Sequence, residues 1–305
     1  CIWFFKIDKY LPSDSRRYWA MKQKNQSFDY AVLGSSRAEG AFDMCMLDSL
    51  TRLKGINIGS SGSGYVDNYL VLNKFLSNHN QIKYLFLQTD IYSLDPSRSF
   101  SNAFHVYNFI PYWDSPIFRE ATSHYLDKND IFIFDYLPWL RFYKYNKFYS
   151  PIQMLQRLRE ENKKNSRIDQ YIKSNYNSTF SNNIKDSSLF YKPVSSKKII
   201  VDSFDLNYFF KIIDLAKSKN IKLICFTAPD YYYQKQVYSN YDTIENDFLS
   251  YIKMKKISYI SKDTSICKNM AFFKDPGHLN DFGRYYNTRF FSNAIKKYNL
   301  SSNSN

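Results

Sequence analysis

The sequence contains few of the residues that mark unusual classes of protein. Its 305 residues include only 8 Gly and 9 Pro, which excludes collagen-like and linker-like compositions. The four cysteines are never spaced as C-x-x-C, and no histidine lies at zinc-finger spacing from them. No stretch approaches the ~20 apolar residues that a membrane-spanning helix needs. These absences predict a soluble body that folds without a structural metal.

The first residues form a short apolar stub, Cys-Ile-Trp-Phe-Phe, followed by Lys6. Three origins fit this stub: the trimmed end of a transmembrane or signal segment, a buried start of the fold, or the processed cysteine of a lipoprotein. The bulky residues directly after Cys1 weaken the third origin. We expect an N-terminal membrane or signal segment that is missing from this chain.

Apolar and basic residues are both abundant. Hydrophobic residues make up 44% of the chain and aromatic residues 19%, so a sizeable core is available. The net charge is +14, but the excess is spread along the chain as single lysines. No helix-turn-helix, zinc-finger or RNA-binding signature accompanies it. The charge therefore favours an anionic envelope surface, or no specific partner, over nucleic acid.

Short apolar runs alternate with segments of helical periodicity. Strands are predicted at residues 28–33, 56–58, 84–87, 221–226 and 257–260, and helices at 37–53, 66–76, 204–219, 235–254 and 279–298. This alternation predicts a flavodoxin-like three-layer α/β/α sandwich with five parallel strands. Residues 96–202 break the pattern and are predicted to form a mostly helical insertion, with helices at 132–140 and 151–161 and a loop at 175–188. One domain results, with its core at 28–95 and 203–298.

Three loops at the carboxyl ends of the predicted strands carry the candidate functional residues, because sites in such sheets lie there. Ser36 follows the first strand, where it is either a nucleophile at a sharp turn or a plain helix cap. The loop 57–64 contains Gly62, whose backbone can approach a ligand closely; a phosphate cradle is the rival, although no P-loop motif occurs. In Asp275-Pro-Gly-His278, a type II turn would bring the carboxylate and the imidazole together, or simply cap the last helix.

Taken together, these loops resemble the sequence blocks of the SGNH/GDSL hydrolase superfamily. Gly34-Ser35-Ser36 resembles the first block, Asn57 and Gly62 the second, and Asp275-x-x-His278-Leu-Asn the last. The resemblance implies a triad of Ser36, His278 and Asp275, with backbone N–H groups of Ser36 and Gly62 as oxyanion donors and no cofactor. The family's third block departs: Thr89 stands where an oxyanion-hole Asn is usual, and its hydroxyl is the expected substitute.

Within the superfamily, the chain resembles envelope proteins of teichoic acid D-alanyl transfer and alginate acetylation. This resemblance implies an extracytoplasmic bacterial esterase or O-acyltransferase that acts on small acyl esters of a surface polysaccharide. It also implies a membrane-bound protein as the partner in acyl transfer. Tyr112 and Trp113 of the insertion are candidates for stacking on sugar rings, although aromatics more often pack cores. The alternatives are an inactive member that binds glycan or scaffolds an assembly, and a flavodoxin-like nucleotide binder.

Overall fold

A five-stranded parallel sheet forms the centre of the protein. The computed structural model describes residues 16–94, 106, 109–137, 141, 190 and 197–298. The strands are β1 (Ser27–Leu33), β2 (Gly55–Asn57), β3 (Gln81–Gln88), β4 (Lys222–Phe226) and β5 (Ser258–Ile260). Their order is β2-β1-β3-β4-β5, and every neighbouring pair is parallel. The predicted α/β class with five parallel strands is confirmed.

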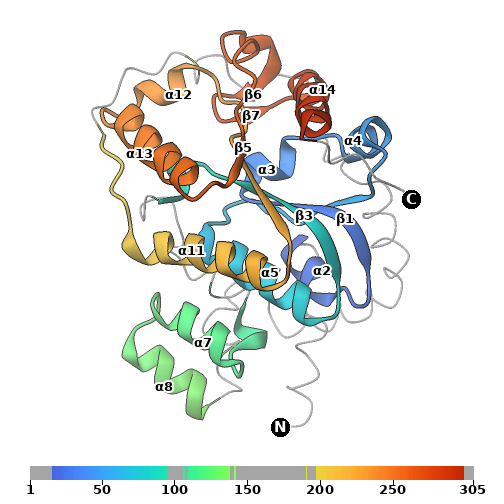
Figure 1. Ribbon diagram of the computed structural model, residues 1–305. Helices are drawn as coiled ribbons and strands as arrows, with labels where there is room; N and C mark the ends of the chain where they lie inside the picture. The colour runs from blue at the N-terminus through green and yellow to red at the C-terminus, as the bar shows by residue number, and fades with distance from the viewer. Residues whose placement is uncertain are drawn as a thin grey trace, which may run out of the picture.

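Helices cover both faces of this sheet (Figure 1). One layer consists of α2 (Arg16–Lys22), α5 (Tyr65–Ser77), α11 (Ser203–Ser218) and α13 (Tyr241–Met254). The opposite layer consists of α3 (Ser36–Gly40), α4 (Met44–Thr51) and α14 (Asp281–Lys297). The three-layer arrangement places the loops that leave the carboxyl ends of the strands between the two helix layers.

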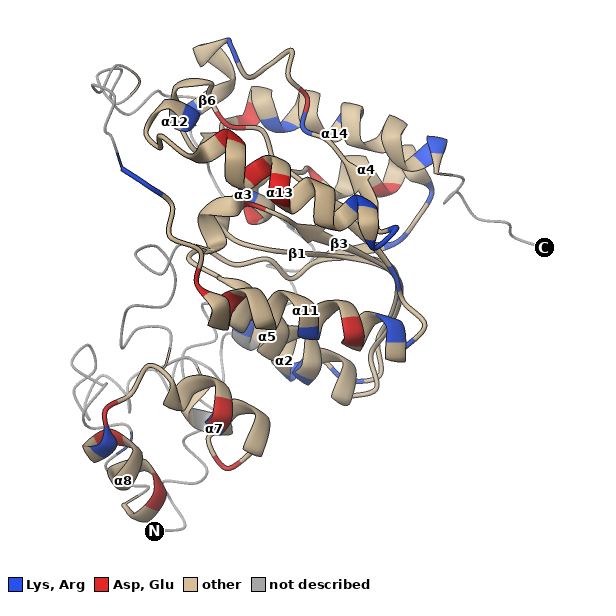
Figure 2. Ribbon diagram, turned by 60° about the vertical axis from the view of Figure 1, so that its left-hand side comes forward, with Lys and Arg blue, Asp and Glu red and all other residues tan. Residues whose placement is uncertain are grey.

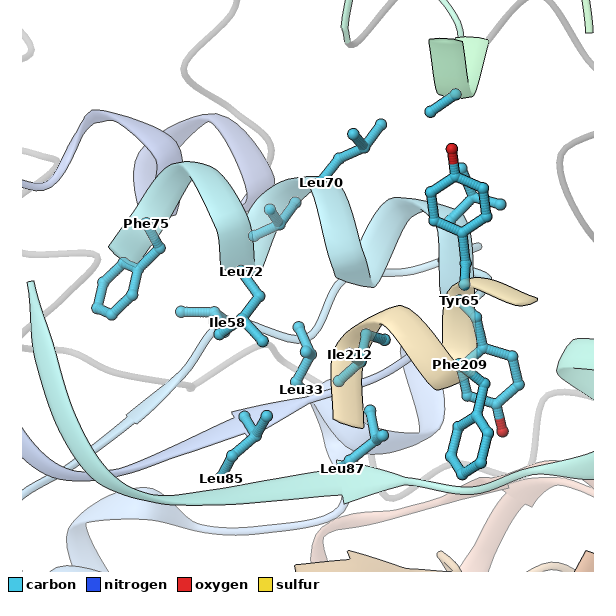
Figure 3. Close-up of a cluster of buried hydrophobic side chains, with 14 of the residues drawn as sticks. Leu33, Ile58, Tyr65, Leu70, Leu72, Phe75, Leu85, Leu87, Phe209 and Ile212 are labelled. Atoms are coloured by element: carbon cyan, nitrogen blue, oxygen red, sulfur yellow. The ribbon is translucent and has the colours of Figure 1, made fainter. Parts of the chain in front are cut away.

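The two layers are held by alternate residues of the same strands. Leu33 and Leu87 face the α5 and α11 layer, where Figure 3 shows them beside Leu72 and Ile212. Val32, the neighbour of Leu33, belongs to the separate cluster under α4 and α14. A strand that is buried on both faces reads as a continuous apolar run, which is why these strands are recognisable in the sequence.

Two predicted helices are interrupted in the structure. The segment 37–53 forms α3 and α4, because Asp43 caps the second helix by accepting a hydrogen bond from Met46 N at 3.0 Å. The segment 235–254 forms a short α12 (Tyr233–Gln236) and then α13. The final helix begins at Asp281 and not at Leu279, because Asn280 occupies its N-cap and accepts from Gly283 N.

The described part of the insertion contains the 3₁₀ turn η2 (Ile110–Tyr112), α7 (Pro116–Ser123) and α8 (Lys128–Tyr136). Figure 1 shows α7 and α8 beyond the α5 and α11 layer, on the side away from the sheet. The helix predicted at 132–140 corresponds to α8, shifted towards the N-terminus. The predicted helix 151–161 and loop 175–188 lie outside the described residues.

The remaining elements lie at the carboxyl ends of the strands. A 3₁₀ turn η1 (Ile91–Leu94) follows β3, and η5 (Met270–Phe272) leads into a hairpin of β6 (Phe273–Asp275) and β7 (His278–Leu279). Figure 2 shows Lys and Arg dispersed over the helices and loops of both layers. Within the residues that the structure describes, no helix has both the length and the apolarity to cross a bilayer.

Candidate active site

Ser36 is the first residue of α3, directly after a sharp turn at the end of β1. The turn depends on Gly34, whose φ of 155° lies in the region that side chains disfavour. A Cβ on Gly34 would also lie 2.5 Å from Gln88 Cβ and 2.7 Å from Ala38 Cβ. Glycine therefore lets the strand pass into the helix within two residues, which places the Ser36 hydroxyl above the edge of the sheet.

Ser36, His278 and Asp275 form a chain of hydrogen bonds, although 242 positions of sequence separate the first two. Ser36 Oγ lies 2.8 Å from His278 Nε2, and His278 Nδ1 lies 2.8 Å from Asp275 Oδ1. A carboxylate at Nδ1 favours the tautomer that carries its proton there. In that tautomer Nε2 has a free lone pair and accepts the hydrogen bond of the Ser36 hydroxyl.

The electrostatics of Asp275 support this arrangement. Partial burial alone would raise the pKa of the Asp275 carboxyl, but its hydrogen bond and charge interaction with His278 outweigh burial. The Gly277 N–H, which donates to Asp275 Oδ1 at 2.9 Å, acts in the same direction. The net effect holds the pKa of Asp275 below its usual value, so the carboxylate is charged near neutral pH.

The hairpin of β6 and β7 carries both Asp275 and His278, but its turn is not the predicted type II turn. Such a turn needs a positive φ at Gly277, and among the described glycines only Gly34 and Gly62 have one. Instead the Asp275 side chain accepts the Gly277 N–H and closes an Asx turn. The prediction that the two ends of the turn meet is nevertheless correct, because the same carboxylate also contacts the imidazole.

A pocket of about 280 Å³ opens beside this chain of hydrogen bonds. It is lined by Ser35, Ser36, Arg37, Gly62, Ser63, Gly64, Asp90, Tyr92, Ser93, Asp275, Pro276, Gly277 and His278. Gly62 has a φ of 72°, which again requires glycine. Within the described part of the chain, the backbone N–H groups of Ser36 and Gly62 have no hydrogen-bond acceptor. Both groups are therefore available to a ligand in the pocket.

The loop that carries Gly62 is tied to the turn that carries Ser36. Asn57 is fully buried; its Nδ2 donates to Ala38 O at 2.9 Å, and its Oδ1 accepts from Gly59 N at 3.0 Å. The Ser60 N–H donates to Gly34 O at 3.0 Å. These bonds fix the relative position of the two loops. Asn57 therefore has a structural role, which is to hold the loop of Gly62 against the helix that begins at Ser36.

Gln88, which the sequence analysis does not predict as a site residue, is hydrogen-bonded to the start of α3. Its Oε1 accepts three hydrogen bonds, from Ser35 N at 2.9 Å, Ser35 Oγ at 3.1 Å and Ala38 N at 3.0 Å. The side chain is buried and is not part of the pocket lining. Gln88 is therefore a positioning group for the residues on either side of Ser36.

A buried cluster of charges continues from Gln88. Its Nε2 donates to Asp90, whose Oδ2 also lies 2.6 Å from Arg37 Nη1. Asp230 lies 4.0 Å from Arg37 and 2.5 Å from Lys262. Burial opposes the charge on Arg37, but the two carboxylates outweigh burial and raise its pKa, so the guanidinium is charged. The sequence carries one indication of this cluster: Asp90 and Asp230 each follow the end of a strand, β3 and β4 respectively.

Thr89, the expected substitute for the oxyanion-hole Asn, does not line the pocket. Its hydroxyl donates to Phe226 O at 3.2 Å and its backbone N–H donates to the same carbonyl at 2.8 Å. The residue is buried against β4, because successive residues past a strand point to opposite sides. The prediction for Thr89 is wrong; its neighbour Asp90 faces the pocket and is paired with Arg37.

Tyr112 and Trp113 are also not part of the pocket. The Trp113 ring is 2% exposed, packs edge-on against Phe134 at 4.9 Å and donates from Nε1 to Asp135. The Tyr112 ring lies 5.7 Å from Lys74 Nζ, ~15 Å along α5 from the end that borders the pocket. The interpretation of Trp113 as a sugar-binding group is corrected, because this residue packs the core of the insertion; Tyr112 does not line the pocket.

No family model matches the chain, and no curated protein was found to be similar to it. Two solved structures are among those to which the chain is similar. The first is a presumed acylhydrolase from Bacteroides fragilis, at 12% identity over 93% of this chain and 95% of that one, with a TM-score of 0.43. The second is a GDSL-like lipase from Bacteroides thetaiotaomicron, at 10% identity over 97% and 99%, with a TM-score of 0.42. The chemistry is inferred from the geometry of the pocket.

Proposed function

We propose that this protein is a serine esterase or O-acyltransferase in which Ser36 is the nucleophile. The observation that carries the proposal is the chain of 2.8 Å contacts from Ser36 Oγ through His278 to Asp275. A serine hydroxyl is a weak nucleophile until a neighbouring base accepts its proton, and the base is most effective when a third group orients it. The geometry supplies all three groups in that order.

The reaction begins with attack of Ser36 Oγ on the carbonyl carbon of an ester. His278 Nε2 accepts the hydroxyl proton, and the charged Asp275 stabilises the imidazolium that forms. The carbonyl oxygen becomes an oxyanion, which the N–H groups of Ser36 and Gly62 stabilise. His278 then donates its proton to the leaving alcohol, and the acyl group remains on Ser36. Water or a sugar hydroxyl completes the cycle by attacking this acyl-enzyme.

We further propose a small acyl group, such as acetyl, as the transferred group. A volume of about 280 Å³ lies just below the usual range for ligand pockets, which begins at about 300 Å³. This small volume favours a short acyl chain over a long lipid chain. The resemblance of the sequence blocks supports a surface polysaccharide as the carbohydrate substrate, in the bacterial envelope, with a membrane-bound protein as the partner in acyl transfer.

A second candidate is a protein of this fold that binds glycan or scaffolds an assembly without turnover. The position of Thr89 favours it, because the hydroxyl expected in the oxyanion hole is bonded to Phe226 O instead. The complete Ser36, His278 and Asp275 arrangement favours catalysis, since a binding protein has no need of it.

Turnover of 4-nitrophenyl acetate distinguishes the two candidates. We expect the wild type to hydrolyse the acetate faster than the octanoate, and Ser36→Ala to reduce hydrolysis to the background rate without lowering thermal stability. Ser218→Ala is a matched substitution of an exposed serine in α11, outside the pocket lining, and is expected to leave the rate unchanged. Equal rates for wild type and purified, folded Ser36→Ala would exclude the proposed nucleophile.

A further inference from the structure

The position of Thr89 leaves the proposed oxyanion hole with two backbone donors and no side-chain donor. Most other polar side chains of the pocket are already committed to partners. The Ser35 hydroxyl donates to Gln88 Oε1, the Tyr92 hydroxyl lies 3.3 Å from Asp230, and Arg37 is bound to Asp90. A further side-chain donor must be a group whose proton is not already donated to another atom of the protein.

Ser63 meets this requirement. It follows Gly62, lines the pocket and is 5% exposed. Its Oγ accepts two hydrogen bonds from one guanidinium, at 3.1 Å from Arg17 Nε and 2.9 Å from Arg17 Nη2. A hydroxyl has two acceptor lone pairs and one donor proton. Because Arg17 can only donate and occupies the acceptor side, the Ser63 proton must point away from it.

Arg17 also fixes the hydroxyl and strengthens it as a donor. The Arg17 side chain is almost fully buried, lies 3.3 Å from the Asp67 carboxylate and donates from Nη2 to Ser61 O at 2.7 Å. The Ser63 N–H is bound to Ser60 O. Hydrogen bonds in a chain polarise one another, so a hydroxyl that accepts from a cation donates more strongly. The group is therefore held in place before any ligand binds.

We propose that the Ser63 hydroxyl is the side-chain donor of the oxyanion hole and that Arg17 is its positioning residue. When the bond from Ser36 Oγ to the carbonyl carbon forms, the π electrons of the carbonyl move to its oxygen and the Ser36 proton moves to His278. The Ser63 O–H then donates to that oxygen and keeps its own proton throughout. This inference rests on the proposed esterase or acyltransferase function.

The test compares Ser63→Ala with Thr89→Val, using 4-nitrophenyl acetate. Loss of one oxyanion donor lowers kcat by about 100-fold or more, so we expect such a fall for Ser63→Ala with a nearly unchanged KM. Thr89→Val, which removes a hydroxyl bonded outside the pocket, and Ser61→Ala, which alters an exposed serine of the same loop, are expected to retain the wild-type kcat. Ser63→Thr keeps the hydroxyl and is expected to restore most of the rate.

Affinity for a trifluoromethyl ketone separates the two possible roles of Ser63, because a residue that only supports the fold would not change this affinity in step with kcat/KM. Ser36 adds to this ketone to give a tetrahedral adduct with a charged oxygen, which mimics the transition state. We expect Ser63→Ala to weaken this affinity by the same factor as kcat/KM, while thermal denaturation shows a folded protein. Ser63→Thr as impaired as Ser63→Ala, or a Ser63→Ala kcat within threefold of an active wild type, would overturn the inference alone. A wild type inert to both ester and ketone would overturn the proposed function itself.

Discussion

Replacement of Gln88 by methionine tests how the start of α3 is held. Methionine has nearly the same length and fills the buried site, but it removes an oxygen that accepts from Ser35 N, Ser35 Oγ and Ala38 N. The serine hydroxyl can turn to another acceptor, whereas the two backbone N–H groups cannot. An unsatisfied buried donor costs about 1–3 kcal/mol, so the loss of an acceptor for these two N–H groups should lower the free energy of unfolding by about 2–6 kcal/mol.

The effect of Gln88→Met on turnover should exceed its effect on folding. A displacement of the nucleophile by about 1 Å can lower the rate by ~100-fold, and Ser36 lies between the two residues that lose their acceptor. Urea denaturation measures the stability and 4-nitrophenyl acetate the rate. Gln81→Met is a matched control, because Gln81 lies at the exposed start of the same strand and its change should stay within about 0.5 kcal/mol. Wild-type stability and turnover in Gln88→Met would refute the reasoning.

Three further predictions concern single groups. Asp275→Asn should lower ester turnover by about 10⁴-fold, because the carboxamide no longer stabilises the imidazolium; a loss below tenfold would contradict the assigned role. Burial raises the pKa of Asp48, bonded to the Tyr30 hydroxyl, from 3.8 to about 6. The folded state therefore loses stability as pH rises from about 4 to 6, by less than the ~3 kcal/mol of the full shift because the group is partly exposed. Asp48→Asn should flatten that decline in urea titrations, and an unchanged slope would count against it. Gly283→Ala should lower the melting temperature, because its Cβ would lie 2.1 Å from Phe272 O, and overpacking costs about 1–3 kcal/mol; an unaltered transition would show that α14 can shift freely.

The strands and the main loops could be predicted because their signals are local. Strands buried on both faces read as apolar runs, and their carboxyl ends identify the loops after β1 and β2 without knowledge of the packing. The break between α3 and α4 had a local signal as well, since Asp43 is a favoured N-cap residue. The apolar spacing continues across the break, however, and so predicts a single helix.

The side-chain environment of the pocket could not be predicted, because it depends on which way residues point after a strand ends. Thr89 and Asp90 are adjacent, yet one is bonded to β4 and the other faces the pocket. The roles of Gln88 and Arg17 depend on contacts with segments 53 and 46 positions away. Trp113 illustrates a different difficulty, since an aromatic side chain fits a core and a sugar site equally well until its neighbours are known.

The central claim, that Ser36 is an activated nucleophile, is tested most directly by intact mass after incubation with a fluorophosphonate. The account predicts a single adduct on the wild type, absent from Ser36→Ala and from His278→Ala because the hydroxyl then lacks its base. A folded wild type that forms no adduct, or a Ser36→Ala protein that still forms one, would contradict it.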